Sequence, residues 1–146
     1  MARLFNVEVF NQTINNGTNY YSPEEFAALL GSAEVLSTDV YVNAGTTAGS
    51  VEVSYQVSNT MESYGWSDAQ ASSGKFTATA FVAPGAGVAK GHVNIIPDDS
   101  FLSFGGGKGT GGFQNQAFGR IVVIFVPDSG DGVATVRVVV CGRSSD

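Results

Sequence analysis

The sequence predicts an all-β protein, an antiparallel β-sandwich of the jelly-roll or immunoglobulin-like type, with one short helix near residues 23–30. Apolar and polar residues alternate with a period of two in several segments, as they do along half-buried antiparallel strands. Glycine, present 19 times, and other turn-forming residues separate these segments. Only one segment carries helix signals, and the length of 146 residues suits a single domain covering 1–146.

Strand-like segments follow one another along the chain. The clearest is SVEVSYQVS (50–58), where Val51, Val53, Tyr55 and Val57 are apolar and the residues between them are polar. This alternation indicates an antiparallel strand with one buried face. The remaining strands are expected at 4–10, 75–83, 91–97, 120–126 and 133–141.

The last two of these segments are nearly all apolar and β-branched. RIVVIFV (120–126) and VATVRVVVC (133–141) are therefore expected to be central strands covered on both faces, with Cys141 a buried small hydrophobe. The sequence PDSGDG (127–132) between them has Pro, Asp and Gly turn chemistry and predicts a hairpin. The segment 40–57 is a second strand–turn–strand unit, interpreted in the same way.

The helix signals lie in YSPEEFAALLGSA (21–33). Ser22 is expected to cap the helix and Pro23 to occupy its first position, and two glutamates follow that suit the positive end of the helix dipole. Gly31 is expected to end the helix. The apolar face of the helix comprises Phe26, Leu29 and Leu30.

Composition excludes several classes of protein. The chain has 7 basic and 13 acidic residues, a net charge of −6, whereas a nucleic-acid binder needs a basic surface. No apolar run approaches the ~20 residues of a membrane span, and the start of the chain lacks the apolar core of a signal peptide. The single cysteine precludes a disulfide within the chain. We therefore expect synthesis in a cytoplasm, with no nucleic acid or membrane as partner.

A glycine-rich segment, SFGGGKGTGGFQNQ (103–116), resembles a phosphate-binding loop only in composition. Gly107-Lys108 is followed by Gly109 instead of Ser or Thr, and a strand follows instead of a helix, so we predict no nucleotide cofactor. Glycine permits close backbone approach, which favours a loop (105–112) that contacts another subunit. The candidate subunit-contact residues are Phe104, Gly105, Gly106, Gly107, Lys108, Gly109, Gly111, Gly112 and Phe113.

No motif predicts a catalytic or metal-binding residue. GWSDA (65–69) has neither the preceding apolar strand nor the following helix of a nucleophile elbow. The aspartates of the turns do not form a calcium-loop series, and nothing supports a hydrolase based on His92, the only histidine. We expect a protein that is not an enzyme and has no cofactor.

Aromatic residues leave one alternative open. Tyrosine and tryptophan stack on sugar rings, but they are also common in sandwich cores and protein interfaces. Trp66 lies in a polar run, which favours an exposed position. The candidate sugar-stacking residues are Tyr55, Tyr64 and Trp66, with Tyr20 and Tyr21 as further members of the set.

Two stretches carry a resemblance to a known class of proteins. DVYVNAGTTAGSVEVSYQVSNTMESYGWSD (39–68) and FGRIVVIFVPDSGDGVATVRVVVCGR (118–143) resemble small β-sandwich virion proteins of tailed bacteriophages, such as capsid decoration or coat proteins. The resemblance implies a structural protein of the virion with no catalytic residues. Its expected partners are copies of itself and other virion proteins.

The sequence therefore predicts a non-enzymatic virion structural protein that self-assembles and coats or cements a phage-type capsid or related particle. The contacts are expected to come from the 105–112 loop and the N-terminal arm, MARLFNVEV. The alternative is a carbohydrate-binding sandwich module, lectin-like and possible as a receptor-binding part of a virion.

Overall fold

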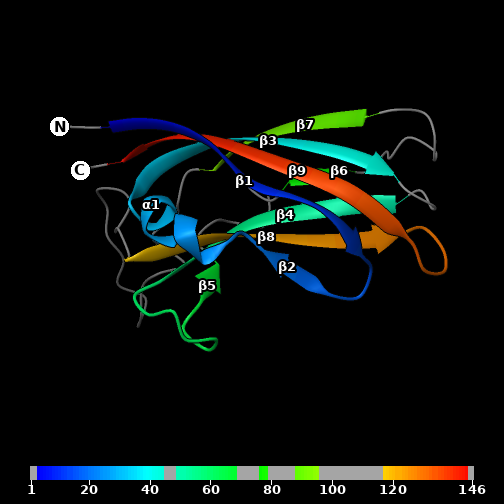
Figure 1. Ribbon diagram of the computed structural model, residues 1–146, viewed down its shortest axis with the longest axis horizontal. Coiled ribbons are helices and arrows are strands. Elements are labelled where there is room, and N and C mark those ends of the chain that lie inside the picture. The colour runs from blue at the N-terminus through cyan, green and yellow to red at the C-terminus, as the bar shows by residue number, and fades with distance from the viewer. Residues whose placement is uncertain (1–2, 45–48, 69–75, 79–87, 96–116, 145–146) are drawn as a thin grey trace, which may run out of the picture.

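The computed structural model describes residues 3–44, 49–68, 76–78, 88–95 and 117–144. Within these ranges the chain is mostly β-strand, and every strand pair is antiparallel. The strands form two sheets, which Figure 1 shows as two layers, and one short helix lies at one end. The predicted all-β class, with antiparallel sheets and a single short helix, is confirmed for the described residues.

The first sheet has four strands in the order β1-β9-β3-β7. These are β1 (Arg3–Asn15), β9 (Val133–Ser144), β3 (Ala33–Ala44) and β7 (Val88–Ile95). The pairing of β1 with β9 places the two ends of the described chain side by side, as Figure 1 shows.

The second sheet has the order β2-β8-β4-β5, with β6 also paired to β4. Its strands are β2 (Asn19–Tyr21), β8 (Phe118–Pro127), β4 (Gly49–Ser58), β5 (Ser67–Asp68) and β6 (Phe76–Ala78). β8 lies between β2 and β4, so the expectation that it is a central strand is confirmed, as it is for β9 between β1 and β3.

The predicted hairpin between the last two strands is wrong. β8 belongs to the second sheet and β9 to the first, so the turn through Gly130, whose φ is +63°, carries the chain from one sheet to the other. The unit formed by β3 and β4 also crosses between the sheets. Turn residues specify that the chain reverses, but they do not specify whether the next strand pairs beside the last one or packs across the core from it.

Four of the strand pairs share a pattern. β1 pairs with β9, β2 with β8, β3 with β7 and β4 with β6. These are the pairs of one long hairpin folded back on itself between β4 and β6. Because consecutive strands of each arm lie in different sheets, the hairpin is rolled up rather than flat.

The two sheets share one hydrophobic core. Alternate residues of β9 point inward, as do alternate residues of β4 and β8, and the largest fully buried side chains include Tyr55 and Phe125. The strict alternation predicted for β4 is confirmed at Val51, Val53, Tyr55 and Val57. The core cluster consists of Val9, Phe10, Ile14, Leu30, Ala33, Val40, Val42, Val51, Val53, Tyr55, Val57, Ile121, Val123, Phe125, Ala134, Val136, Val138 and Val140.

The prediction that β8 and β9 are covered on both faces is wrong, and so is the expected burial of Cys141. On the outer face of β8, Val126 is exposed and Ile124 is half-buried. Thr135, Arg137 and Cys141 all lie on the outer face of β9 and are exposed. β-branched residues suit the extended backbone on either face of a sheet, so a run of valines does not by itself indicate two buried faces.

The helix begins with a 3₁₀ turn, η1 (Glu24–Phe26), which continues into α1 (Ala27–Gly31). Ser22 does not cap it, contrary to prediction. Its Oγ accepts a hydrogen bond from the Ile121 backbone N–H at 2.9 Å, and its own N–H donates to the Ile121 carbonyl at 3.0 Å. Ser22 therefore extends the pairing between β2 and β8. Its hydroxyl bonds to β8 and does not cap the helix.

Gly31 ends the helix as predicted, but the reason for a glycine at this position is a close backbone contact. A Cβ at Gly31 would lie 2.6 Å from the Phe118 Cα, and a Cβ at Gly119 would lie 2.8 Å from the Leu30 carbonyl carbon. Helix and strand thus meet backbone to backbone. The Tyr55 hydroxyl, buried in the core, donates a 2.5 Å hydrogen bond to the Leu30 carbonyl and ties β4 to the same helix.

Candidate functional site

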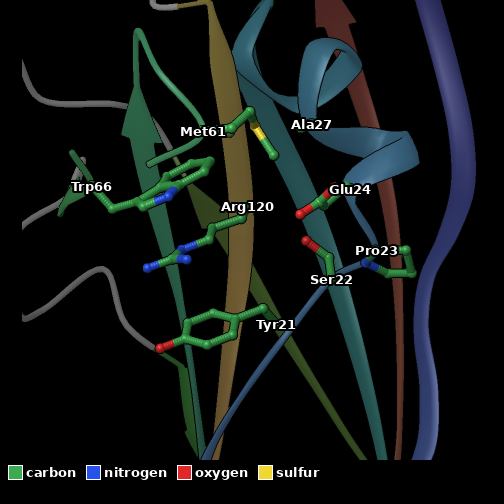
Figure 2. A pocket seen from close by; sticks show the side chains of 9 residues that line it. Tyr21, Ser22, Pro23, Glu24, Ala27, Met61, Trp66 and Arg120 are labelled. Carbon is green, nitrogen blue, oxygen red and sulfur yellow. The ribbon is translucent and has the colours of Figure 1, made fainter. Parts of the chain in front are cut away.

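The candidate site is a pocket where β2, the helix and β8 meet, which we term the Arg120 pocket (Figure 2). Its volume is about 130 Å³. Two of the large apolar side chains that are exposed in the described chain, Tyr21 and Met61, form part of its wall. The lining residues are Tyr21, Ser22, Pro23, Glu24, Ala27, Met61, Trp66, Gly119 and Arg120.

Strand register brings the central residues of this pocket together. Arg120 lies directly opposite Gln56 on β4, and Tyr21 lies opposite Val122, which is two residues from Arg120 and on the same face. Trp66 immediately precedes β5, which pairs with the end of β4. Three segments distant in sequence thus converge on one outer face of the second sheet.

The Arg120 guanidinium is held between two aromatic rings. Its carbon lies 4.0 Å from the centre of the Tyr21 ring and 4.3 Å from the centre of the Trp66 ring, as Figure 2 illustrates. Its Nε donates a 2.8 Å hydrogen bond to Gln56 Oε1. Stacking and this hydrogen bond restrict the side chain from several directions, so its orientation is set before any ligand arrives.

Among the side chains that the structure describes, none balances the charge of Arg120. Among the described residues, no carboxylate lies within 4.0 Å of its guanidinium, whereas Lys90 pairs with Asp39 at 3.8 Å and Arg137 pairs with Glu8 at 2.5 Å. Burial lowers the pKa of Arg120, an effect that Tyr21 opposes, but an arginine in a protein stays protonated. The pocket therefore holds a positive charge together with the Glu24 carboxyl group on its lining.

A second hollow on the outer face of the first sheet is electrostatically balanced. Tyr41 lies beneath two cations, with Arg137 at 5.2 Å and Lys90 at 5.8 Å from its ring centre. The hydrogen bond from Arg137 is the main cause that lowers the pKa of Glu8, with a smaller contribution from Asn11. Because both cations have carboxylate partners, this face is less suited than the Arg120 pocket to bind an anionic ligand.

The proposed sugar-stacking residues do not form one platform. Tyr55 is fully buried in the core, so its assignment as a stacking residue is wrong: period-two alternation placed it on the inner face of β4. Tyr64 is 81% exposed but does not line the Arg120 pocket. Trp66 and Tyr21 do line it, while Tyr20 packs against the core and its hydroxyl accepts a hydrogen bond from the Asn15 N–H.

Other predicted residues lie outside the described part of the chain. All nine candidate subunit-contact residues, from Phe104 to Phe113, fall within 96–116, which the structure does not describe. The backbone of His92 lies in β7, opposite Asp39. Within the described ranges, no group of three or more His, Cys, Asp or Glu side chains is placed to hold a metal ion.

Sequence reasoning missed Arg120, the residue around which the pocket is built. One signal was available: Arg120 is the only charged residue in FGRIVVIFV (118–126). A lone cation in an apolar strand faces away from the core, where water, a partner or a ligand can solvate its charge. Its aromatic neighbours could not be found this way, because they come from two distant segments.

Comparison with known proteins yields no relative for this chain: no family model and no curated protein matches it. No helix in the described ranges is both long and apolar enough to cross a membrane.

Proposed function

We propose that the chain is a jelly-roll sandwich and that it serves as a virion structural protein, which self-associates to coat or cement a phage-type capsid or related particle. The observation that carries this proposal is the set of strand pairs β1–β9, β2–β8, β3–β7 and β4–β6, divided between two sheets. A rolled-up hairpin of two sheets is the arrangement of jelly rolls, which recur in viral capsid and lectin domains.

Jelly rolls serve many functions, and the proposed virion role rests on a surface feature as well as on the fold. It is supported by the surface of the second sheet. Val126 is 53% exposed and Tyr21 42% exposed on its outer face, and Ile124 on the same face is half-buried. Exposed apolar side chains that share one sheet face favour contact with another protein surface.

Self-association through this face would work by burying apolar area. A stable interface between proteins needs roughly 1,000 Å² or more of buried surface, which a sheet face of this kind and the predicted 105–112 loop together could supply. The low fraction of charged residues, 14% against about 25% in a typical soluble domain, is consistent with a surface partly covered by neighbouring subunits.

Light scattering at increasing protein concentration, with negative-stain electron microscopy of the same samples, tests the proposal. We expect rings, tubes, shells or defined oligomers, and we expect Val126→Lys to weaken assembly about tenfold or more. Thr135→Lys, which adds the same charge at an exposed site on the other sheet, is the matched control. A monomer of 15.1 kDa at every concentration would contradict self-association.

A second candidate function, carbohydrate binding, is favoured by one observation. The Arg120 pocket combines the aromatic side chains of Tyr21 and Trp66, whose rings enclose the Arg120 guanidinium, with the carboxyl group of Glu24. Sugar-binding sites use aromatic faces for the apolar side of a ring and polar groups for its hydroxyls.

A further inference from the structure

Arg120 presents a preorganised fork of hydrogen-bond donors to the pocket. Its Nε is bonded to Gln56, whereas its two terminal amino groups have no hydrogen-bond acceptor among the described residues. Stacking between Tyr21 and Trp66 holds the plane of the guanidinium in place. A guanidinium fixed in this way matches the two oxygens of a carboxylate, which it binds through paired, charge-assisted hydrogen bonds.

A half-buried cation with no counter-ion among the described side chains also favours an anionic ligand energetically. Partial burial of Arg120 costs solvation free energy. No ion pair with a described carboxylate offsets this cost. Two other cations, Lys90 and Arg137, already have carboxylate partners. Arg120 is therefore better placed than Lys90 or Arg137 to gain from a ligand carboxylate.

The other residues that line the pocket indicate which groups the ligand carries besides its carboxylate. Glu24 lines the same pocket and is exposed, so its carboxyl group can accept hydrogen bonds from hydroxyls but would repel a second anion. Met61, Trp66 and Ala27 supply an apolar surface. The complementary ligand has one carboxylate, several hydroxyl groups and one face of C–H bonds.

The volume of the pocket matches one ring of a ligand, whose substituents extend through its open side. A cavity of ~150 Å³ accommodates one benzene ring, and the Arg120 pocket measures about 130 Å³ and is open on one side. Pockets for drug-sized ligands measure about 300–1,000 Å³. A nucleotide or an extended oligosaccharide is therefore too large to enter whole.

We propose that the Arg120 pocket binds a carboxylated monosaccharide of the uronic-acid or sialic-acid class, free or at the end of a glycan, with its carboxylate on Arg120 and its hydroxyls toward Glu24. This inference deepens the carbohydrate-binding candidate and does not depend on self-assembly. It assigns the sugar's C–H face to the wall formed by Met61 and Trp66.

The chain carries its own reporter for this pocket, because Trp66 is its only tryptophan. The full chain is titrated with glucuronate, N-acetylneuraminate, glucose, acetate and a tetraglutamate peptide, and Trp66 emission is recorded. We expect saturable changes with the acidic sugars, with Kd on the order of 1 mM for a single ring. Glucose lacks the carboxylate and acetate lacks the sugar ring, so each should bind at least tenfold more weakly than the acidic sugars.

Substitutions at Arg120 and Glu24 test which ligand group each residue contacts. Arg120→Gln should weaken acidic-sugar binding roughly tenfold to hundredfold, and Arg120→Lys, which keeps the charge but loses the fork, should also lose most of it. Glu24→Gln should weaken the sugars but not acetate. Arg137→Gln is the matched control, because Arg137 also stacks on a tyrosine but lies on the other sheet, and it should leave binding unchanged.

Two further measurements keep the result interpretable. Urea unfolding establishes that each variant is folded, and ligand-observed NMR saturation transfer follows binding without relying on Trp66 emission. Equal affinity for glucose and glucuronate, or unchanged acidic-sugar binding in Arg120→Gln, would overturn the proposal. Equal or tighter binding of tetraglutamate would overturn the sugar assignment in favour of an acidic peptide.

The same samples separate this proposal from the structural one. Loss of sugar binding in Arg120→Gln with unchanged oligomers would support a ligand site independent of assembly. Loss of oligomers in that variant, with no acidic-sugar binding by the wild type, would overturn the ligand proposal and identify the pocket as a subunit contact.

Discussion

The backbone contact between α1 and β8 leads to a prediction for Gly119→Ala. The added methyl group would lie 2.8 Å from the Leu30 carbonyl carbon, 2.9 Å from the Gly31 nitrogen and 2.9 Å from Tyr55 Cε1. Two of these atoms belong to the helix backbone and cannot rotate away. Since ordinary contacts begin near 3.4 Å, the helix must retreat from β8 by the missing 0.5–0.6 Å.

The cost of this retreat has two parts. Overpacking a closely packed site costs about 1–3 kcal/mol. The retreat also stretches the 2.5 Å hydrogen bond from the Tyr55 hydroxyl to the Leu30 carbonyl, and a hydrogen bond of this kind contributes about 0.5–1.5 kcal/mol. We expect Gly119→Ala to lower the free energy of unfolding by about 2–4 kcal/mol, a large share of the ~5–15 kcal/mol typical of a domain.

Urea unfolding followed by circular dichroism measures this change. With a slope near 2 kcal/mol per molar urea, the midpoint should fall by about 1–2 M. Ser129→Ala, in an exposed turn, is the control and should stay within about 0.5 kcal/mol of the wild type.

Gly31→Ala supplies a second test of the same contact. Its methyl group would meet the Phe118 backbone at 2.6 Å, so one displacement of the helix relieves both substitutions. The double variant should therefore cost at least about 1 kcal/mol less than the sum of the single ones. A Gly119→Ala variant as stable as the wild type, or strict additivity, would refute the backbone contact.

Two further predictions follow from Tyr55 and Cys141. Burial raises the pKa of Tyr55 above its ordinary value; above about pH 10 the unfolded chain releases a proton that the folded chain keeps. Wild-type stability should therefore fall with pH faster than that of Tyr55→Phe, by up to about 1.4 kcal/mol per pH unit. Urea unfolding at pH 9, 10 and 11 checks this, and equal slopes would contradict it. Cys141 is exposed, so native protein should react fully with a thiol-specific reagent; labelling that requires denaturant would show that it is covered.

Strands could be predicted from the sequence because their signal is local. The alternation of Val51, Val53, Tyr55 and Val57 sufficed to place β4 and to identify its inner face. The same argument, applied fully, assigns Tyr55 to the core rather than to a sugar site. Local signals also located the helix, although the predicted capping role of Ser22 was wrong because its hydroxyl bonds to β8.

The candidate site was only partly predictable. Trp66 and Tyr21 were both recognised as possible stacking residues from composition, but Arg120 was not, and nothing in the sequence indicated that these three would meet. Arg120 and Gln56 are 64 positions apart and become neighbours through the register of β4 and β8. Such a register depends on how two sheets fit over one core.

The sequence by itself determined the class of the fold, most of its strands, its one helix and which face of β4 is buried. Hydrophobic burial acts on each segment separately, and its period is visible in the residues themselves. Only the tertiary structure decided that β8 and β9 lie in different sheets, that α1 touches β8 through two glycines, and that Arg120 stacks between two aromatic rings. These features depend on contacts between residues far apart in the chain, for which local periodicity carries no signal.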